Sequence, residues 1–215
     1  MIICFLGNDG SGKTAYALKI YQQLQKNGFT CKYLHLESLF IGKILEFKNN
    51  FNNNESLGNN ILPHDNSRNT GFFKYLVNYI KIVMFMLDNL SFYILKMKWN
   101  MDTNTILILD RYFYDTIISS IILKTNPYLI EKIYLKIFPL PEAIILLNID
   151  YKTACHRKGE LIFETNQDLF CKKSNIYNNF CSKLSAKLLI VESSSDFDIC
   201  HNEIEKWISI ILEDR

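Results

Sequence analysis

The feature that most constrains this chain is a glycine-rich loop that directly follows its first apolar run. Residues 2–6 are five consecutive apolar side chains, and they predict a buried strand. Residues 7–14 read GNDGSGKT and match G-x-x-x-x-G-K-[ST] at every fixed position. The run 15–24 that follows reads as a helix. A chance glycine-rich turn is the alternative, but strand, loop and helix in this order are the context that makes the pattern specific for phosphate binding.

The residue types in this loop each have a physical reason. The three glycines let the backbone wrap a phosphate without Cβ clashes, while the loop N–H groups and the helix N-terminus supply partial positive charge. Lys13 can reach the β- and γ-phosphates, and the Thr14 hydroxyl can ligate Mg²⁺. We therefore expect ATP to be bound by Gly7, Asn8, Asp9, Gly10, Ser11, Gly12, Lys13 and Thr14.

Length and composition set the class of protein. The 215 residues fit one domain, and the net charge of +2 is too small to argue for a nucleic-acid partner. The six cysteines show no C-x-x-C pair and no metal-like clustering, so we interpret them as reduced residues, several of them buried, in a cytoplasmic protein. Because the first strand is predicted to begin at Ile2, we expect no signal peptide ahead of the loop.

Apolar runs alternate with helical segments along the rest of the chain. Further strands are predicted at 31–36, 105–109, 143–149 and 187–191, and helices at 13–27, 114–123, 127–138, 168–184 and 199–212, with another after Asp150. This alternation predicts a mainly parallel sheet covered by helices on both faces. The expected fold is a single doubly wound α/β domain over residues 1–215, with a five-stranded parallel sheet.

Two segments stand apart from this pattern. Seven of the thirteen residues 48–60 are asparagine, so we predict a mobile polar loop at about 48–70. The segment 72–99 is the most apolar, and Lys74, Asn78, Lys81 and Asp88 fall on one polar stripe at helical spacing. Charges interrupt it too often for a membrane span. We favour a long helix, or two in succession, buried in the core with part in a homodimer interface, over attachment to a membrane surface.

Charged residues gather at the predicted strand ends, where open α/β sheets bind ligands. Glu37 follows the second strand, and it is either a functional carboxylate or a solvated one. Asp110 and Arg111 follow the strand 105–109, and a simple ion pair at the strand end is the alternative to a functional role. The basic cluster 156–158 either closes over phosphates or forms a solvated helix face.

Four stretches together resemble the thymidylate kinase family and its relatives, in the order in which that family carries them. The glycine-rich loop at 7–14 is similar to the phosphate loop of the family, including its Asp-Gly pair. LDRYFYD at 109–115 resembles the family's Asp-Arg-Tyr motif, and LPEAIILLNID at 140–150 resembles the proline-rich start of its fourth strand. ACHRKGE at 154–160 is similar to its basic lid.

The resemblance implies a P-loop fold of the nucleoside-monophosphate-kinase group and transfer of the ATP γ-phosphoryl group, with thymidylate (dTMP) as acceptor. It implies that Lys13 holds the phosphates and that Thr14 and Asp110 serve the Mg²⁺ ion. Arg111 would stabilise the transferred group or bind the acceptor. Arg157 and Lys158 would close as a lid spanning about 154–173.

Two departures from the family pattern lie on the acceptor side. The family's arginine on the long helix is missing from FMLDNL at 85–90, and its Arg-Glu-Pro-Gly-like sequence is replaced by LESLF at 36–40. A kinase of a hydroxyl acceptor therefore remains an alternative, with Glu37 as the base that related deoxynucleoside kinases place at a strand end. A nucleotide-binding switch that hydrolyses ATP slowly is a further alternative.

Overall fold

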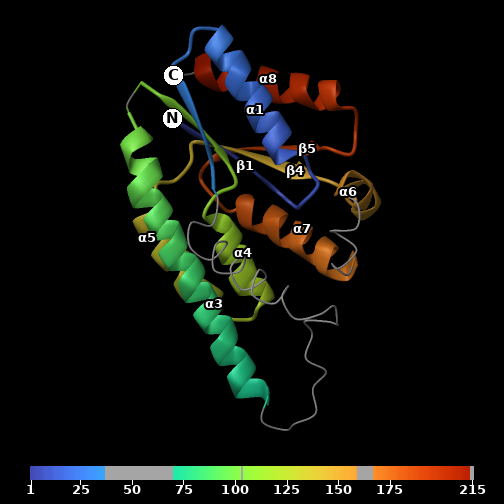
Figure 1. The fold of residues 1–215 in the computed structure, drawn as a ribbon. Coiled ribbons are helices and arrows are strands. Elements are labelled where there is room, and N and C mark those ends of the chain that lie inside the picture. The colour runs from blue at the N-terminus through green and yellow to red at the C-terminus, as the bar shows by residue number, and fades with distance from the viewer. Residues whose placement is uncertain (37–69, 103, 159–166, 214–215) are drawn as a thin grey trace, which may run out of the picture.

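A computed structural model describes residues 1–36, 70–102, 104–158 and 167–213 (Figure 1). Its centre is a five-stranded sheet in the order β2-β3-β1-β4-β5 with every pair parallel. The strands are β1 Ile2–Gly7, β2 Cys31–His35, β3 Ile106–Asp110, β4 Ala143–Asn148 and β5 Lys187–Glu192. The predicted five-stranded parallel sheet is confirmed.

The central strands are buried on both faces, as continuous apolar runs in a parallel sheet require. Along β1, Cys4 and Leu6 belong to one core cluster, whereas Ile3 and Phe5 belong to the other. The helices α1 Lys13–Lys26 and α8 Phe197–Glu213 pack on the second cluster. The opposite face is covered by α3 Thr70–Phe92, α4 Tyr114–Ile122, α5 Pro127–Ile137 and α7 Gln167–Cys181 (Figure 1). The fold is therefore doubly wound.

Several helix starts follow from local capping chemistry. Asn126 accepts a hydrogen bond from the Leu129 N–H at 3.2 Å, and Pro127 fills the first helical position of α5. Asp150 accepts from the Thr153 N–H at 2.8 Å at the start of α6, Tyr151–Lys158. Both starts agree with the sequence-based expectation. Five of the six cysteines are buried, and Cys171 is exposed.

The long helix α3 differs from the prediction in which of its side chains are buried and which are exposed. It continues into a π-helical turn, Tyr93–Met97, and a 3₁₀ turn, Lys98–Asn100. Its outward face lies outside the core of the chain, where four apolar side chains at helical spacing are 39–60% exposed: Leu76, Ile80, Val83 and Leu87. The homodimer interface expected for part of the segment stays a prediction. The polar stripe is in part internal, because Asp88 is only 5% exposed and Asn78 donates to the Leu123 carbonyl at 3.3 Å.

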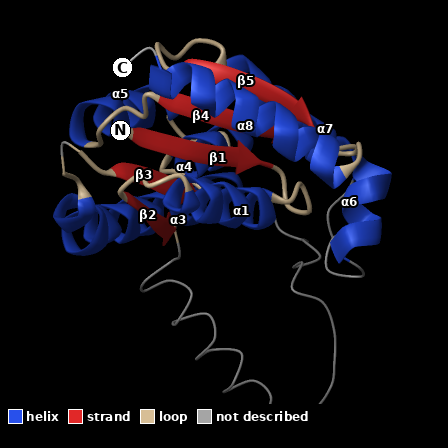
Figure 2. Cartoon of the chain, turned by 90° about the horizontal axis from the view of Figure 1, so that it is seen from above, coloured by secondary structure: helices blue, strands red, loops and turns tan. Residues whose placement is uncertain are grey.

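The parallel order brings the carboxyl ends of distant strands to one edge. In the register, Phe5 of β1 and His35 of β2 both lie opposite Asp110 of β3. The loop after β1, the residues after β3 and the start of α6 therefore lie at the same edge of the sheet (Figure 2). Chain order reverses between β1 and β4, which is where such sheets bind ligands.

Within the described ranges, no helix combines the length and the apolar character that crossing a membrane requires.

Candidate active site

The loop between β1 and α1 depends on glycine at specific positions. Gly7 has φ +139°, and a Cβ there would lie 2.3 Å from the Leu147 carbonyl oxygen of β4. Gly10 has φ +85°, and a Cβ would lie 3.1 Å from the backbone of Ala154 on α6. The loop is therefore closely packed against both β4 and α6. Its concave backbone is of the kind that binds phosphate, which is consistent with the prediction from the sequence.

Lys13 is the first residue of α1, directly after this loop, and is only 5% exposed. Its Nζ donates to the carbonyl oxygens of Gly7 at 3.0 Å and Asn8 at 2.7 Å. Burial, followed by the nearby Arg111 charge, lowers the pKa of Lys13 to about 8. The ammonium thus lies against the loop and is largely shielded from water. A bound anion would stabilise its charge there.

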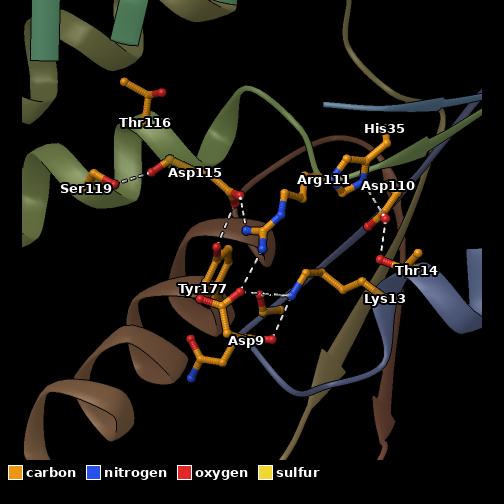
Figure 3. Close-up of polar contacts among 12 residues, drawn as sticks. Asp9, Lys13, Thr14, His35, Asp110, Arg111, Asp115, Thr116, Ser119 and Tyr177 are labelled. Atoms are coloured by element: carbon orange, nitrogen blue, oxygen red, sulfur yellow. Dashed lines mark hydrogen bonds and ion pairs between the residues drawn. The ribbon is translucent and has the colours of Figure 1, made fainter. Parts of the chain in front are cut away.

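The structure brings together Thr14 and Asp110, the two residues that the sequence assigns to Mg²⁺. The Thr14 hydroxyl donates to Asp110 Oδ2 at 2.6 Å, and the Tyr33 hydroxyl donates to the same oxygen at 3.1 Å. His35 Nδ1 lies 2.6 Å from it as well (Figure 3). The other oxygen, Asp110 Oδ1, is buried and has no hydrogen-bond partner among the described residues. A hydroxyl beside an orphaned carboxylate oxygen fits the oxygen ligands that Mg²⁺ takes in phosphate sites.

Arg111 does not form the simple ion pair with Asp110 that was the alternative expectation. Its backbone is left-handed, with φ +72°, which is uncommon for a residue with a Cβ. Its Nη2 lies 2.7 Å from Asp9 Oδ1, and its Nη1 lies 3.4 Å from Asp115 Oδ2. Tyr177 of α7 donates to the other oxygen of Asp115 at 2.6 Å (Figure 3). The guanidinium is therefore held from the loop on one side and from α4 on the other.

Asp9 and Arg111 each stabilise the charged form of the other. Burial raises the pKa of Asp9, but Lys13 and then Arg111 outweigh it and lower the pKa to about 2. Burial lowers the pKa of Arg111, but Asp115 and Asp9 outweigh it and raise the pKa above its usual value. Both groups stay ionised at neutral pH, so the ion pair persists there.

A cavity of about 140 Å³ lies on the side of Arg111 that faces α3 and α4. Among its lining residues are Leu36, Phe85, Asp88, Asn89, Arg111 and Thr116. Asn89 Nδ2 donates to Thr116 Oγ1 at 2.8 Å and to the Tyr134 hydroxyl at 2.9 Å, which fixes the amide. The aromatic ring of Phe85 and several polar side chains therefore line the same cavity, and Arg111 lies in its wall.

Arg157 lies near the other end of the site. Its Nη2 donates to the Ser193 carbonyl after β5 at 2.8 Å. It follows Ala154, the α6 residue packed on Gly10, by one helical turn, so it is on the same face of α6. Lys158 is the last residue of α6, and its side chain lies outside the description, as do residues 159–166 of the predicted lid. Glu37 and nearly all of the predicted 48–70 loop are likewise outside the described residues.

Sequence reasoning missed the residues that hold the site from neighbouring elements. Asn8 Nδ2 donates to Ser174 Oγ at 2.6 Å and to the Phe170 carbonyl at 3.1 Å, which ties the loop to α7. Tyr33, His35 and Tyr177 were missed as well. The alternation of strand 31–36 was a signal for the first two, but no local pattern points to Tyr177.

Comparison with known proteins gives a distant sequence similarity. No family model matches the chain. It is 28% identical over 156 residues to a protein of Sulfurisphaera tokodaii described as "Probable thymidylate kinase", and the alignment covers 72% of this chain and 67% of that protein. The five-stranded parallel sheet with its loop is consistent with a P-loop kinase fold. The similarity suggests the thymidylate kinase family and supports a kinase.

The close packing of Gly10 on α6 predicts a specific loss of stability. Gly10→Ala and Gly28→Ala both place a Cβ on a residue with positive φ, at +85° and +83°. Such a backbone costs about 1–2 kcal/mol with a Cβ. A Cβ at Gly10 meets other atoms, whereas a Cβ at Gly28 has no atom of the described residues within 4 Å. Urea unfolding should therefore show Gly10→Ala to be less stable than Gly28→Ala by about 1–3 kcal/mol. Equal losses would contradict the packing of α6 on the loop.

Proposed function

We propose that this protein is a Mg²⁺–ATP-dependent nucleotide kinase that transfers the γ-phosphoryl group to a nucleoside monophosphate, with thymidine monophosphate as the first acceptor to consider. The observation that carries the proposal is the place of Arg111. It pairs with the phosphate-type loop through Asp9 and also lines the cavity beside α3 and α4. A cation between a donor site and an acceptor cavity is what phosphoryl transfer needs. The similarity to a probable thymidylate kinase supports the same acceptor class.

Each group of site residues has a separate role in the proposed reaction. The amides of the loop and Lys13 bind the β- and γ-phosphates of ATP. Thr14 and Asp110 hold Mg²⁺, which neutralises charge on the phosphate oxygens when bound. Arg111 orients the acceptor phosphate against the γ-phosphorus. Arg157 and Lys158 close over the donor from α6.

The transfer balances without a covalent enzyme intermediate. An oxygen of the acceptor phosphate forms a bond to the γ-phosphorus, and the bond from that phosphorus to the β-phosphate oxygen breaks. ADP leaves with the electron pair, and the acceptor becomes a diphosphate. The contribution of the protein is positioning and charge stabilisation, for which Lys13 and Arg111 are the cations.

A neutral hydroxyl compound is the second candidate acceptor, and one observation favours it. Arg111 already faces two carboxylates, Asp9 and Asp115, and Asp88 lines the same cavity. Among the described lining residues, Asp88 and Asp115 outnumber the single guanidinium of Arg111, so that part of the wall offers no net positive charge to a phosphate dianion. In that case Glu37 would act as the base that takes the proton of the hydroxyl.

A screen of acceptors decides between these functions. With ATP and Mg²⁺, ADP release should rise above the no-acceptor background with nucleoside monophosphates, thymidine monophosphate among them. Lys13→Ala should lower the rate by about 10²-fold or more without unfolding the protein. Arg111→Ala should raise the acceptor KM strongly, and Glu37→Gln should have a modest effect.

The opposite pattern would overturn the assignment. A protein that leaves every nucleoside monophosphate untouched, yet phosphorylates a nucleoside or sugar alcohol and loses kcat in Glu37→Gln, is a hydroxyl kinase. Retention of most activity in a folded Lys13→Ala variant would remove the loop from the mechanism.

The pKa of Lys13 predicts a proton linked to ATP binding. In the free protein this pKa is about 8, so about half of the lysines are neutral at pH 8. The phosphates favour the ammonium and raise the pKa, so binding at pH 8 takes up about half a proton, and ATP affinity falls as the pH rises through about 8. Calorimetry in buffers of different ionisation enthalpy measures this uptake, and Lys13→Met should abolish it. Equal proton uptake by the wild type and by Lys13→Met would show that a group other than Lys13 takes up the proton.

A further inference from the structure

Tyr177 lies outside every motif that the sequence analysis singled out, yet it touches the charged network of the site. It is on α7, is 1% exposed, and donates its hydroxyl hydrogen to Asp115 Oδ1 at 2.6 Å. Burial, followed by the Asp115 charge, raises its pKa well above the usual value. The hydroxyl therefore stays protonated and remains a donor throughout the physiological range.

Asp115 links Tyr177 to Arg111. Its two oxygens divide their partners, with Oδ1 accepting from Tyr177 and Oδ2 facing Arg111 Nη1 (Figure 3). The separation from Nη1 is 3.4 Å, longer than the 2.7 Å between Nη2 and Asp9. The weaker of the two contacts thus depends on the rotation of the Asp115 carboxylate, which the Tyr177 hydroxyl fixes.

We propose that Tyr177 is a positioning residue for the acceptor phosphate, because it orients Asp115 and, through Asp115, the guanidinium of Arg111. The inference rests on the proposed function, in which Arg111 binds that phosphate. Arg111 has a left-handed backbone, and its shorter ion pair is with Asp9. A second contact is therefore needed to keep the guanidinium at the cavity wall. Tyr177 supplies that anchor from a helix that does not itself line the cavity.

The same helix also holds the donor side. Asn8 of the phosphate loop donates to Ser174 and to the Phe170 carbonyl, both on α7 and within two turns of Tyr177. One rigid helix therefore fixes the loop and the arginine relative to each other. This arrangement keeps the donor phosphate and the acceptor phosphate in register, which transfer between them requires.

Tyr114 offers a matched control. It is 2% exposed and packs its ring on Phe180 of α7, with centroids 5.1 Å apart. Its hydroxyl is buried with no hydrogen-bond partner among the described residues. Tyr177→Phe and Tyr114→Phe therefore remove the same atom from similar surroundings, and only the first breaks a bond to Asp115.

The test compares kinetic constants for thymidine monophosphate and for ATP in the two variants. Tyr177→Phe should raise the KM of the acceptor about tenfold, the scale for a hydrogen bond to a charged group, and leave the KM of ATP within about twofold. Tyr114→Phe should change neither constant. Asp115→Asn should raise the acceptor KM in the same direction. The double variant Tyr177→Phe/Asp115→Asn should raise the acceptor KM no more than the more impaired single variant does. Both changes break the same chain of contacts, from Tyr177 through Asp115 to Arg111.

The outcomes separate this inference from the proposed function. If the wild-type protein phosphorylates no nucleoside monophosphate, the proposed function is wrong and the inference falls with it. If the wild type is active but Tyr177→Phe matches Tyr114→Phe, only the inference is wrong. Equal losses for ATP and acceptor in Tyr177→Phe, or additive effects in the double variant, would show a general structural role and overturn the inference. If Tyr177→Phe does not fold, Asp115→Asn decides, and an unchanged acceptor KM overturns the inference.

Discussion

The pairing of Arg111 with Asp9 and Asp115 is the interaction on which the rest of the site depends. It joins the loop after β1, the residue after β3 and the first turn of α4, and it compensates for the left-handed backbone of Arg111. A conformation of this kind costs about 1–3 kcal/mol and persists only where the surroundings hold it. Two carboxylates supply that hold. They also set the charge of the site, because two carboxylates face one guanidinium and keep it ionised before any anion arrives.

The sheet makes this pairing available. Placing β3 beside β1 brings Asp110 to within hydrogen-bond distance of Thr14, although the two residues are 96 positions apart in the chain. The same register brings His35 of β2 to Asp110. The helices then close the site from the carboxyl edge, with α6 packed on Gly10 and α7 tied to Asn8. The proposed donor and acceptor positions thus both lie against elements that contact the loop.

Local patterns in the sequence carried much of this account. The loop, the five strands, the Pro127 and Asp150 helix starts and the meeting of Thr14 with Asp110 follow from motif, apolar runs and capping chemistry. Partners contributed by remote elements did not follow, because a sequence does not show which helix face meets which. The Asp9–Arg111–Asp115 network, the Tyr177 hydroxyl and the Asn8 tether are of this kind. The same limit applies to α3, on which Asp88 of the polar stripe is buried and lines the cavity, whereas Leu87 is exposed.

A crystal structure with ADP, Mg²⁺ and thymidine monophosphate tests the central claim most directly. We expect the ADP phosphates on the amides of residues 7–14 and the metal beside Thr14 and Asp110. The acceptor phosphate should lie within hydrogen-bond distance of the Arg111 guanidinium, with Asp115 still bonded to Tyr177. An acceptor phosphate bound away from Arg111, or ADP bound outside the loop, would contradict it.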